Sequence, residues 1–223
     1  MKLVDPKRRV DLTKSKFVYN VFQIIFKSYM MTEAASLAYR NGFWTNYLWE
    51  CNSYNPSNPV MANLQWINYV SKIFDLMDTV IMVVEQKSRQ LNFVHVYHHT
   101  FSLTLNWIAT KAHYDGDIFI IILLISMEHV LIYLYFFAAM HAKDPATGQS
   151  VLLPWKNHLM VAQLCILALT LMNFGLKMSM GCPGSRISMI SFVMIFGQIT
   201  LTLTLDGTRL LMIRVYSKKS RRH

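Results

Sequence analysis

The chain has 223 residues, of which 22 are Lys or Arg and 12 are Asp or Glu, so its formal net charge is +10. Charged residues make up 15% of the sequence and hydrophobic residues 53%, against about 25% and about 45–50% in a typical soluble domain. This composition excludes a disordered chain, argues against a soluble nucleic-acid binder, and favours an integral membrane protein.

Six predominantly apolar segments approach the roughly 20 residues that a helix needs to cross a bilayer. In chain order they are 17–39, 61–84, 91–109, 118–139, 159–174 and 187–205. Turn-forming sequences separate them, among them YNPSNP at 54–59 and GCPGS at 181–185. The sequence therefore predicts an all-α, polytopic membrane protein with six transmembrane helices, organised as a single domain over 1–223.

Basic residues outside these segments predict the orientation. Sixteen Lys and Arg fall in the N-terminal arm 1–16, the tail 206–223 and the two loops that share their side, against four in the loops on the other side. Lys and Arg collect in cytosolic loops. Both termini are therefore predicted to be cytosolic, as a basic arm and a basic tail.

Charged residues recur within the second apolar segment. Lys72, Asp75 and Asp78 follow one another at steps of three, so on a helix they form one polar stripe in which Lys72 can pair with Asp75. Ionisable groups inside a membrane usually face the protein interior or a water-filled cavity. Two interpretations remain open: a buried ion pair that holds helices together, and a direct catalytic role.

Histidines cluster at the start of the third segment. His95 lies one helical turn from both His98 and His99, so three imidazoles crowd the predicted cytosolic end of this helix. Packing explains a single histidine well, and three within five residues far less readily. In the fourth segment His129 and Tyr133 are four residues apart and share a face.

The number and spacing of the histidines limit the kinds of site that they could form. The chain has eight histidines but only one cluster of them, which argues against a di-iron site of the kind that desaturases build from several histidine boxes, and no CxxC pair suggests a thiolate metal site. Neutral imidazole suits acid–base or nucleophilic catalysis. Two alternatives are a non-catalytic receptor or transporter, and a haem protein with His98 and His129 as axial ligands.

The motifs taken together resemble the fatty acid elongase family. The resemblance rests first on the box HVYHH at 95–99, preceded by SKIFDLMDT at 71–79. Further agreement, in family order over nearly the whole chain, comes from YNVFQ at 19–23, NPSNP at 55–59, the pair His129 and Tyr133, PWK at 154–156 followed by Gln163, and GCP at 181–183.

This resemblance implies an endoplasmic reticulum protein in which six helices surround a closed acyl tunnel, with the family's first helix missing from this chain. It implies the condensation of long-chain acyl-CoA with malonyl-CoA to give 3-oxoacyl-CoA, CO2 and CoA, without a metal or other cofactor. The implied partners are the two CoA substrates, the lipid bilayer, and the reductases and dehydratase of the elongation cycle, with no nucleic acid.

The resemblance also implies roles for individual residues. His98 is expected to take the acyl group as an acyl-imidazole, and His129 to assist from across the tunnel, with His95 and His99 completing the catalytic box. The residues expected to order the site or contact substrate are Lys72, Asp75, Asp78, Tyr133 and Gln163. The sequence departs from the family pattern at Asp75, where the family has Glu, and at Ile125, where it has Asn.

A disulfide is expected between Cys51 and Cys182. The charge pattern places both cysteines in loops on the non-cytosolic side, which for an endoplasmic reticulum protein is the oxidising lumen. Their α carbons would need to lie about 4.4–6.8 Å apart. The alternative is two free cysteines in separate loops, and Cys165, inside a helix, is expected to stay reduced.

Overall fold

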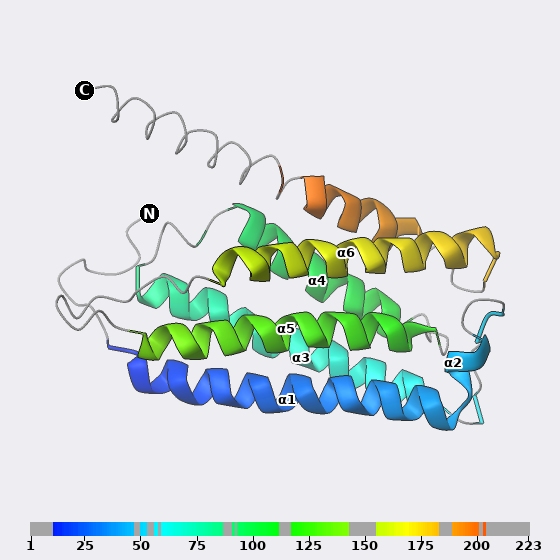
Figure 1. The fold of residues 1–223 in the computed structure, drawn as a ribbon, viewed down its shortest axis with the longest axis horizontal. Helices are drawn as coiled ribbons and strands as arrows, with labels where there is room; N and C mark the ends of the chain where they lie inside the picture. The colour runs from blue at the N-terminus through cyan, green and yellow to red at the C-terminus, as the bar shows by residue number, and fades with distance from the viewer. Residues whose placement is uncertain are drawn as a thin grey trace.

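A computed structural model describes residues 11–46, 50–52, 56–57, 59–86, 91, 93–111, 117–142, 155–182, 189–200 and 203. Six helices are α1 (Thr13–Arg40), α2 (Phe43–Asn46), α3 (Val60–Val84), α4 (Phe93–Lys111), α5 (Ile118–His141) and α6 (Lys156–Ser179). A further apolar helix covers Met189–Thr200. Figure 1 shows them as an elongated bundle in which α1 lies along α5, and this last helix, in orange, runs beside the end of α6. No strand occurs in these ranges, so the predicted all-α class is confirmed for them.

The helices follow the apolar segments, with differences at their ends. The largest is in α6, which runs from Lys156 to Ser179 where apolarity alone predicts 159–174. Hydropathy marks the part of a helix suited to lipid, whereas the backbone hydrogen bonds continue through polar residues at either end. Residues 13–16 of the predicted basic arm already belong to α1, while the basic tail 206–223 lies outside the described residues.

Two described helices are long and apolar enough to cross a membrane by length and composition alone, over Ile118–His141 and His158–Ser179. Charged side chains lower the mean hydropathy of α1 and α3, which include Lys27 and Lys72 respectively. Six membrane spans therefore stay a prediction.

Several charged side chains are buried inside the bundle, while many large apolar side chains are exposed on its surface. Lys27, Lys72 and Asp75 are only 2%, 3% and 3% exposed, whereas Val18 and Met172 are 66% and 69% exposed. Soluble proteins keep Lys and Asp at the surface, but a helix bundle in lipid gains by turning its polar groups inward, where they find partners. The outer surface of this bundle is suited to lipid.

The apolar core fills one half of the bundle. Its buried residues come from the second half of α1 and the first halves of α3 and α5, namely Met30, Ala34, Leu37, Ala38, Met61, Leu64, Ile118, Phe119 and Ile122. A smaller cluster joins α4, α6 and the last helix through Phe101, Phe174 and Ile195. The buried polar residues lie next to this core, before it on α1 and after it on α3 and α5, so the apolar core holds the three helices together beside the polar interior.

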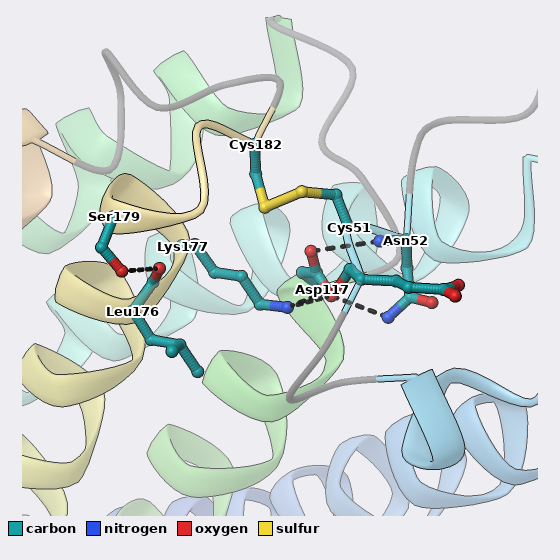
Figure 2. The surroundings of a disulfide bond; sticks show 8 residues. Cys51, Asn52, Asp117, Leu176, Lys177, Ser179 and Cys182 are labelled. Carbon is teal, nitrogen blue, oxygen red and sulfur yellow. Dashed lines mark hydrogen bonds and ion pairs between the residues drawn. A yellow bond between two sulfur atoms is a disulfide. The ribbon is translucent and has the colours of Figure 1, made fainter.

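A disulfide closes the end of the bundle near α2. Cys51 and Cys182 are bonded, with their α carbons 5.5 Å apart, so the predicted pairing is present in the structure. Beneath it, Lys177 Nζ lies 3.1 Å from Asp117 Oδ1, and Asn52 Nδ2 donates to the same oxygen at 2.7 Å (Figure 2). The segment after α2, the start of α5 and the end of α6 are thereby tied together.

We expect Cys51→Ser and Cys182→Ser each to lower the stability of the folded protein, because the bridge restricts the unfolded chain across 131 residues. Loss of a disulfide typically costs about 2–4 kcal/mol. Electrophoresis of the membrane protein with and without reductant should show a mobility shift that both variants lack. Cys165 is free and exposed, so Cys165→Ser should keep the shift. An unchanged shift in Cys51→Ser would contradict the pairing.

Candidate active site

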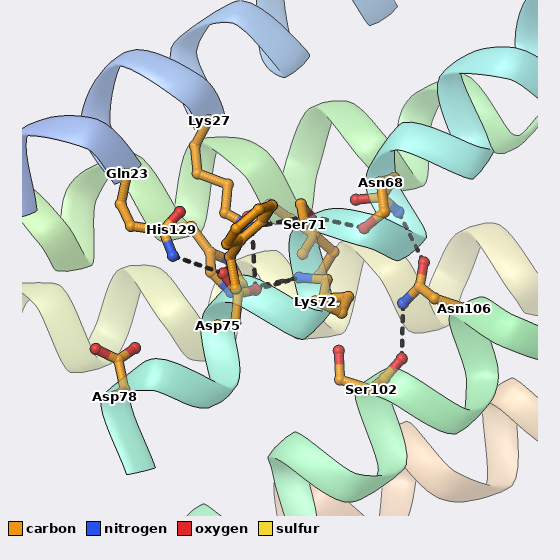
Figure 3. A network of polar contacts seen from close by, with 12 residues as sticks. Gln23, Lys27, Asn68, Ser71, Lys72, Asp75, Asp78, Ser102, Asn106 and His129 are labelled. Carbon is orange, nitrogen blue, oxygen red and sulfur yellow. Dashed lines mark hydrogen bonds and ion pairs between the residues drawn. The ribbon is translucent and has the colours of Figure 1, made fainter. Parts of the chain in front are cut away.

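One buried carboxylate organises the polar interior. Asp75 of α3 accepts from Lys27 Nζ of α1 at 2.9 Å, from Lys72 Nζ one turn earlier on α3 at 3.2 Å, and from Gln23 Nε2 at 3.0 Å (Figure 3). His129 Nε2 of α5 lies 3.4 Å from the same side chain. The pair of Lys72 with Asp75 is therefore present, and it is part of a cluster that also compensates Lys27. Such compensation is what allows charges to remain buried.

Lys27 and Gln23 are site residues that the sequence interpretation missed. They are four residues apart on α1 and so share one face, and Lys27 Nζ also donates to Ser71 Oγ at 3.0 Å. The signal was available in the sequence, because Lys27 is a charge inside an apolar segment, as Lys72 is.

The ring of His129 is fixed at both nitrogens. Its Nδ1 lies 2.7 Å from the carbonyl oxygen of Ile125, so Nδ1 carries the proton and donates it. In the neutral ring Nε2 is then an acceptor, and it lies 3.4 Å from Lys72 Nζ. The haem alternative needs a nitrogen of His129 directed at iron, whereas both nitrogens already have polar contacts within the protein.

The three histidines of the box have different surroundings. His98 lines a cavity together with Lys72. His95 Nε2 instead lies 3.0 Å from Thr79 Oγ1 of α3, and the rings of His95 and His99 are 4.3 Å apart. Only His98 of the three is among the residues lining that cavity. In the described ranges no three His, Cys, Asp or Glu side chains are grouped so as to hold a metal ion.

The cavity has a volume of about 90 Å3 and lies between α3, α4, α5, α6 and the last helix. It holds several water-sized spheres, each of which needs about 10–15 Å3, so a small polar group fits. The polar lining residues are Asn68, Lys72, His98, Ser102, Asn106, Thr170 and Gln198. The apolar ones are Phe101, Leu105, Ile121, Ile125, Leu167, Phe174 and Ile195. The cavity thus brings an imidazole and an ammonium group together with apolar walls.

Two predicted site residues, Asp78 and Gln163, bond to partners other than Asp75. Asp78 accepts from the Tyr133 hydroxyl at 2.8 Å, and that hydroxyl lies 3.2 Å from the hydroxyl of Tyr19; Figure 3 shows Asp78 apart from the lysines. Gln163 donates to Glu128 at 3.5 Å, between α6 and α5. The Tyr133 hydroxyl also accepts from Gln23 Nε2 at 3.2 Å, so Asp78 is linked to Asp75 through Tyr133 and Gln23. Asp78 nevertheless bonds to Tyr133 rather than to the lysines. At about 3.6 residues per turn, each step of three falls about 60° short of a full turn.

Comparison with known sequences gives a consistent set of relatives. The sequence model of the GNS1/SUR4 family (ELO) matches residues 1–220. Very long chain fatty acid elongase 7 of Rattus norvegicus is 30% identical over 225 residues, covering 99% of this chain and 76% of that protein. Very long chain fatty acid elongase 4 of Homo sapiens is 31% identical over 170 residues, which cover 74% of this chain and 52% of that protein.

Proposed function

Since the chain belongs to the GNS1/SUR4 family, we propose that it elongates fatty acids by condensing long-chain acyl-CoA with malonyl-CoA. The products are 3-oxoacyl-CoA two carbons longer, CO2 and CoA. One observation carries the proposal most strongly: His98 and the buried Lys72 open onto the same cavity with apolar walls. A nucleophile, a cation and an apolar surface are what the transfer of a fatty acyl group requires.

The proposed reaction has two halves. A nitrogen of His98 attacks the acyl thioester carbonyl, the C–S bond breaks, and CoA leaves as the thiol with the proton that the imidazole loses. Malonyl-CoA then releases CO2, and its carbanion attacks the acyl-imidazole to form the new C–C bond. The C–N bond breaks, and the imidazolate that leaves takes up a proton from water to restore neutral His98. Splitting one transfer into two steps through a covalent intermediate is the general advantage of nucleophilic catalysis.

The surrounding residues support this chemistry in the proposal. His129, held by Ile125 and Lys72, assists transfer from α5, the helix that faces the cavity through Ile121 and Ile125. His95 and His99 pack together beside His98 on α4 and position its ring. The residues that order the site are Lys72, Asp75, Asp78, Tyr133 and Gln163.

The family match and the apolar helices indicate a multi-pass membrane protein. We further propose six spans enclosing an acyl tunnel, of which the cavity at His98 is the reacting end, in the endoplasmic reticulum membrane with both termini cytosolic. The proposed protein needs no cofactor, and its product passes to the reductases and dehydratase of the elongation cycle.

Membranes that contain the protein should convert radiolabelled malonyl-CoA and a long-chain acyl-CoA into 3-oxoacyl-CoA two carbons longer. A panel of acyl-CoAs of different length and unsaturation identifies the substrate by the fastest labelling. Membranes from cells without the protein serve as the background. Absence of labelled product above that background with every acyl-CoA, from protein that remains folded, would refute the proposed function.

A further inference from the structure

The ammonium group of Lys72 has a donor to spare. An ammonium group carries three N–H bonds. In the described part of the chain Lys72 Nζ has two hydrogen-bond partners, Asp75 Oδ2 at 3.2 Å and His129 Nε2 at 3.4 Å. Lys72 is 3% exposed and lines the cavity that His98 also lines. The third N–H is thus left for a group inside this cavity.

Lys27 differs from Lys72 although both bind the same carboxylate. Lys27 Nζ lies 2.9 Å and 3.0 Å from the two oxygens of Asp75, and it donates to Ser71 Oγ at 3.0 Å. It is not among the residues that line the cavity at His98. Lys27 therefore holds Asp75 in place, while the ammonium group of Lys72 both binds Asp75 and faces the cavity.

We propose that the third N–H of Lys72 binds the thioester carbonyl oxygen of acyl-CoA and stabilises the negative charge that develops on this oxygen. The inference rests on the proposed function. As the His98 nitrogen bonds to the carbonyl carbon, the C=O electron pair moves to oxygen. It returns when the C–S bond breaks and the imidazole proton passes to sulfur. A donor already fixed at the oxygen favours this transition state.

The neighbours of Lys72 suit it to this role. Asp75 and His129 fix two of its hydrogen bonds, so the ammonium group is oriented before substrate arrives. Removing Lys72 does not leave Asp75 alone, because Lys27 and Gln23 still donate to its carboxylate. We therefore expect Lys72→Met to fold, and Lys27→Met is its matched control, since it removes the other cation from the same carboxylate.

The first test measures binding without turnover. Two stable CoA analogues of equal chain length are compared: a ketone, in which a methylene separates sulfur from the carbonyl, and an S-alkyl thioether, which has no carbonyl. Purified wild-type protein should bind the ketone tighter by on the order of tenfold or more, since a hydrogen bond from a charged donor is stronger than a neutral one. Lys72→Met should bind both analogues equally, and Lys27→Met should keep the difference.

Three results would overturn the assignment of Lys72. The first is that wild type binds the ketone and the thioether with equal affinity. The second is that Lys72→Met still binds the ketone tighter than the thioether. The third is that Lys27→Met loses its preference for the ketone as completely as Lys72→Met does. A role for Lys72 in structure alone would weaken the binding of both analogues together, so the ratio of the two affinities separates the roles.

The second test measures transfer of the acyl group to the protein when malonyl-CoA is withheld. Lys72→Met should be acylated about 10²–10³-fold more slowly than wild type, the usual effect of removing one such donor. Wild type that condenses, combined with Lys72→Met that acylates at the wild-type rate, would overturn this inference and leave the proposed function standing. Wild type that forms no 3-oxoacyl-CoA would refute the function itself, independently of the analogue ratio.

Discussion

Replacing His98 with Ala should abolish condensation, with a loss of at least about 10³-fold in turnover, as for other enzymes that lose their nucleophile. The protein should stay folded, because His98 stands at the wall of a cavity and a smaller apolar side chain merely enlarges that space. Wild type incubated with labelled acyl-CoA alone should hold the label in a form that hydroxylamine releases. His98→Ala should hold none.

A matched control is available in the same chain. His158 lies near the start of α6 and is exposed, so His158→Ala removes an imidazole without touching the cavity. It should keep turnover and label near the wild-type values. Turnover at the wild-type rate in His98→Ala would mean that another group accepts the acyl chain.

Replacing Asp75 with Leu should destabilise the protein more than any other change in the buried cluster. The substitution leaves Lys27 and Lys72 in the interior without the carboxylate that lies 2.9 Å and 3.2 Å from them. Breaking a buried ion pair by removing one partner typically costs about 3–5 kcal/mol. Thermal unfolding of the purified protein in one detergent should show the loss as a lower midpoint.

The cause can be separated from general damage to the helix. Removing both cations as well, in Lys27→Met with Lys72→Met and Asp75→Leu, should recover a large part of the lost stability, because no uncompensated charge then remains. Asp78→Leu should cost less, since a tyrosine hydroxyl rather than an ammonium group is its bonded partner. A triple variant less stable than Asp75→Leu would contradict this account of the cluster.

Local relations along one helix could be predicted from the sequence. The apolar segments predict the helices, because a run of apolar residues bounded by turns allows few alternatives in lipid. The pairing of Lys72 with Asp75 follows from their spacing of three. Contacts between helices could not be predicted in this way. Gln23 and Lys27 contact Asp75 although they are about fifty residues away in sequence. The spacing of polar residues along α1 does not determine which side of α1 faces α3.

The same limit explains how the predicted site divides. The spacing of His95, His98 and His99 predicts a cluster, but the direction of each ring depends on the helix that it meets. The direction of the side chains also changes along α3. Lys72 and Asp78 are six residues apart, so their side chains point about 120° apart around the helix axis. Asp78 therefore meets Tyr133, while Lys72 meets the cavity.

The bridge between Cys51 and Cys182 also bears on the biosynthesis of the protein. Because 131 residues separate the two cysteines, α3 to α6 must all leave the ribosome before the second thiol becomes available. Until then Cys51 lacks the partner that it has in the folded protein. The disulfide can thus form only after the helices from α1 to α6 have been synthesised and have packed so that the two cysteines are adjacent. Nascent chains halted before Cys182 would keep an unpaired thiol at residue 51.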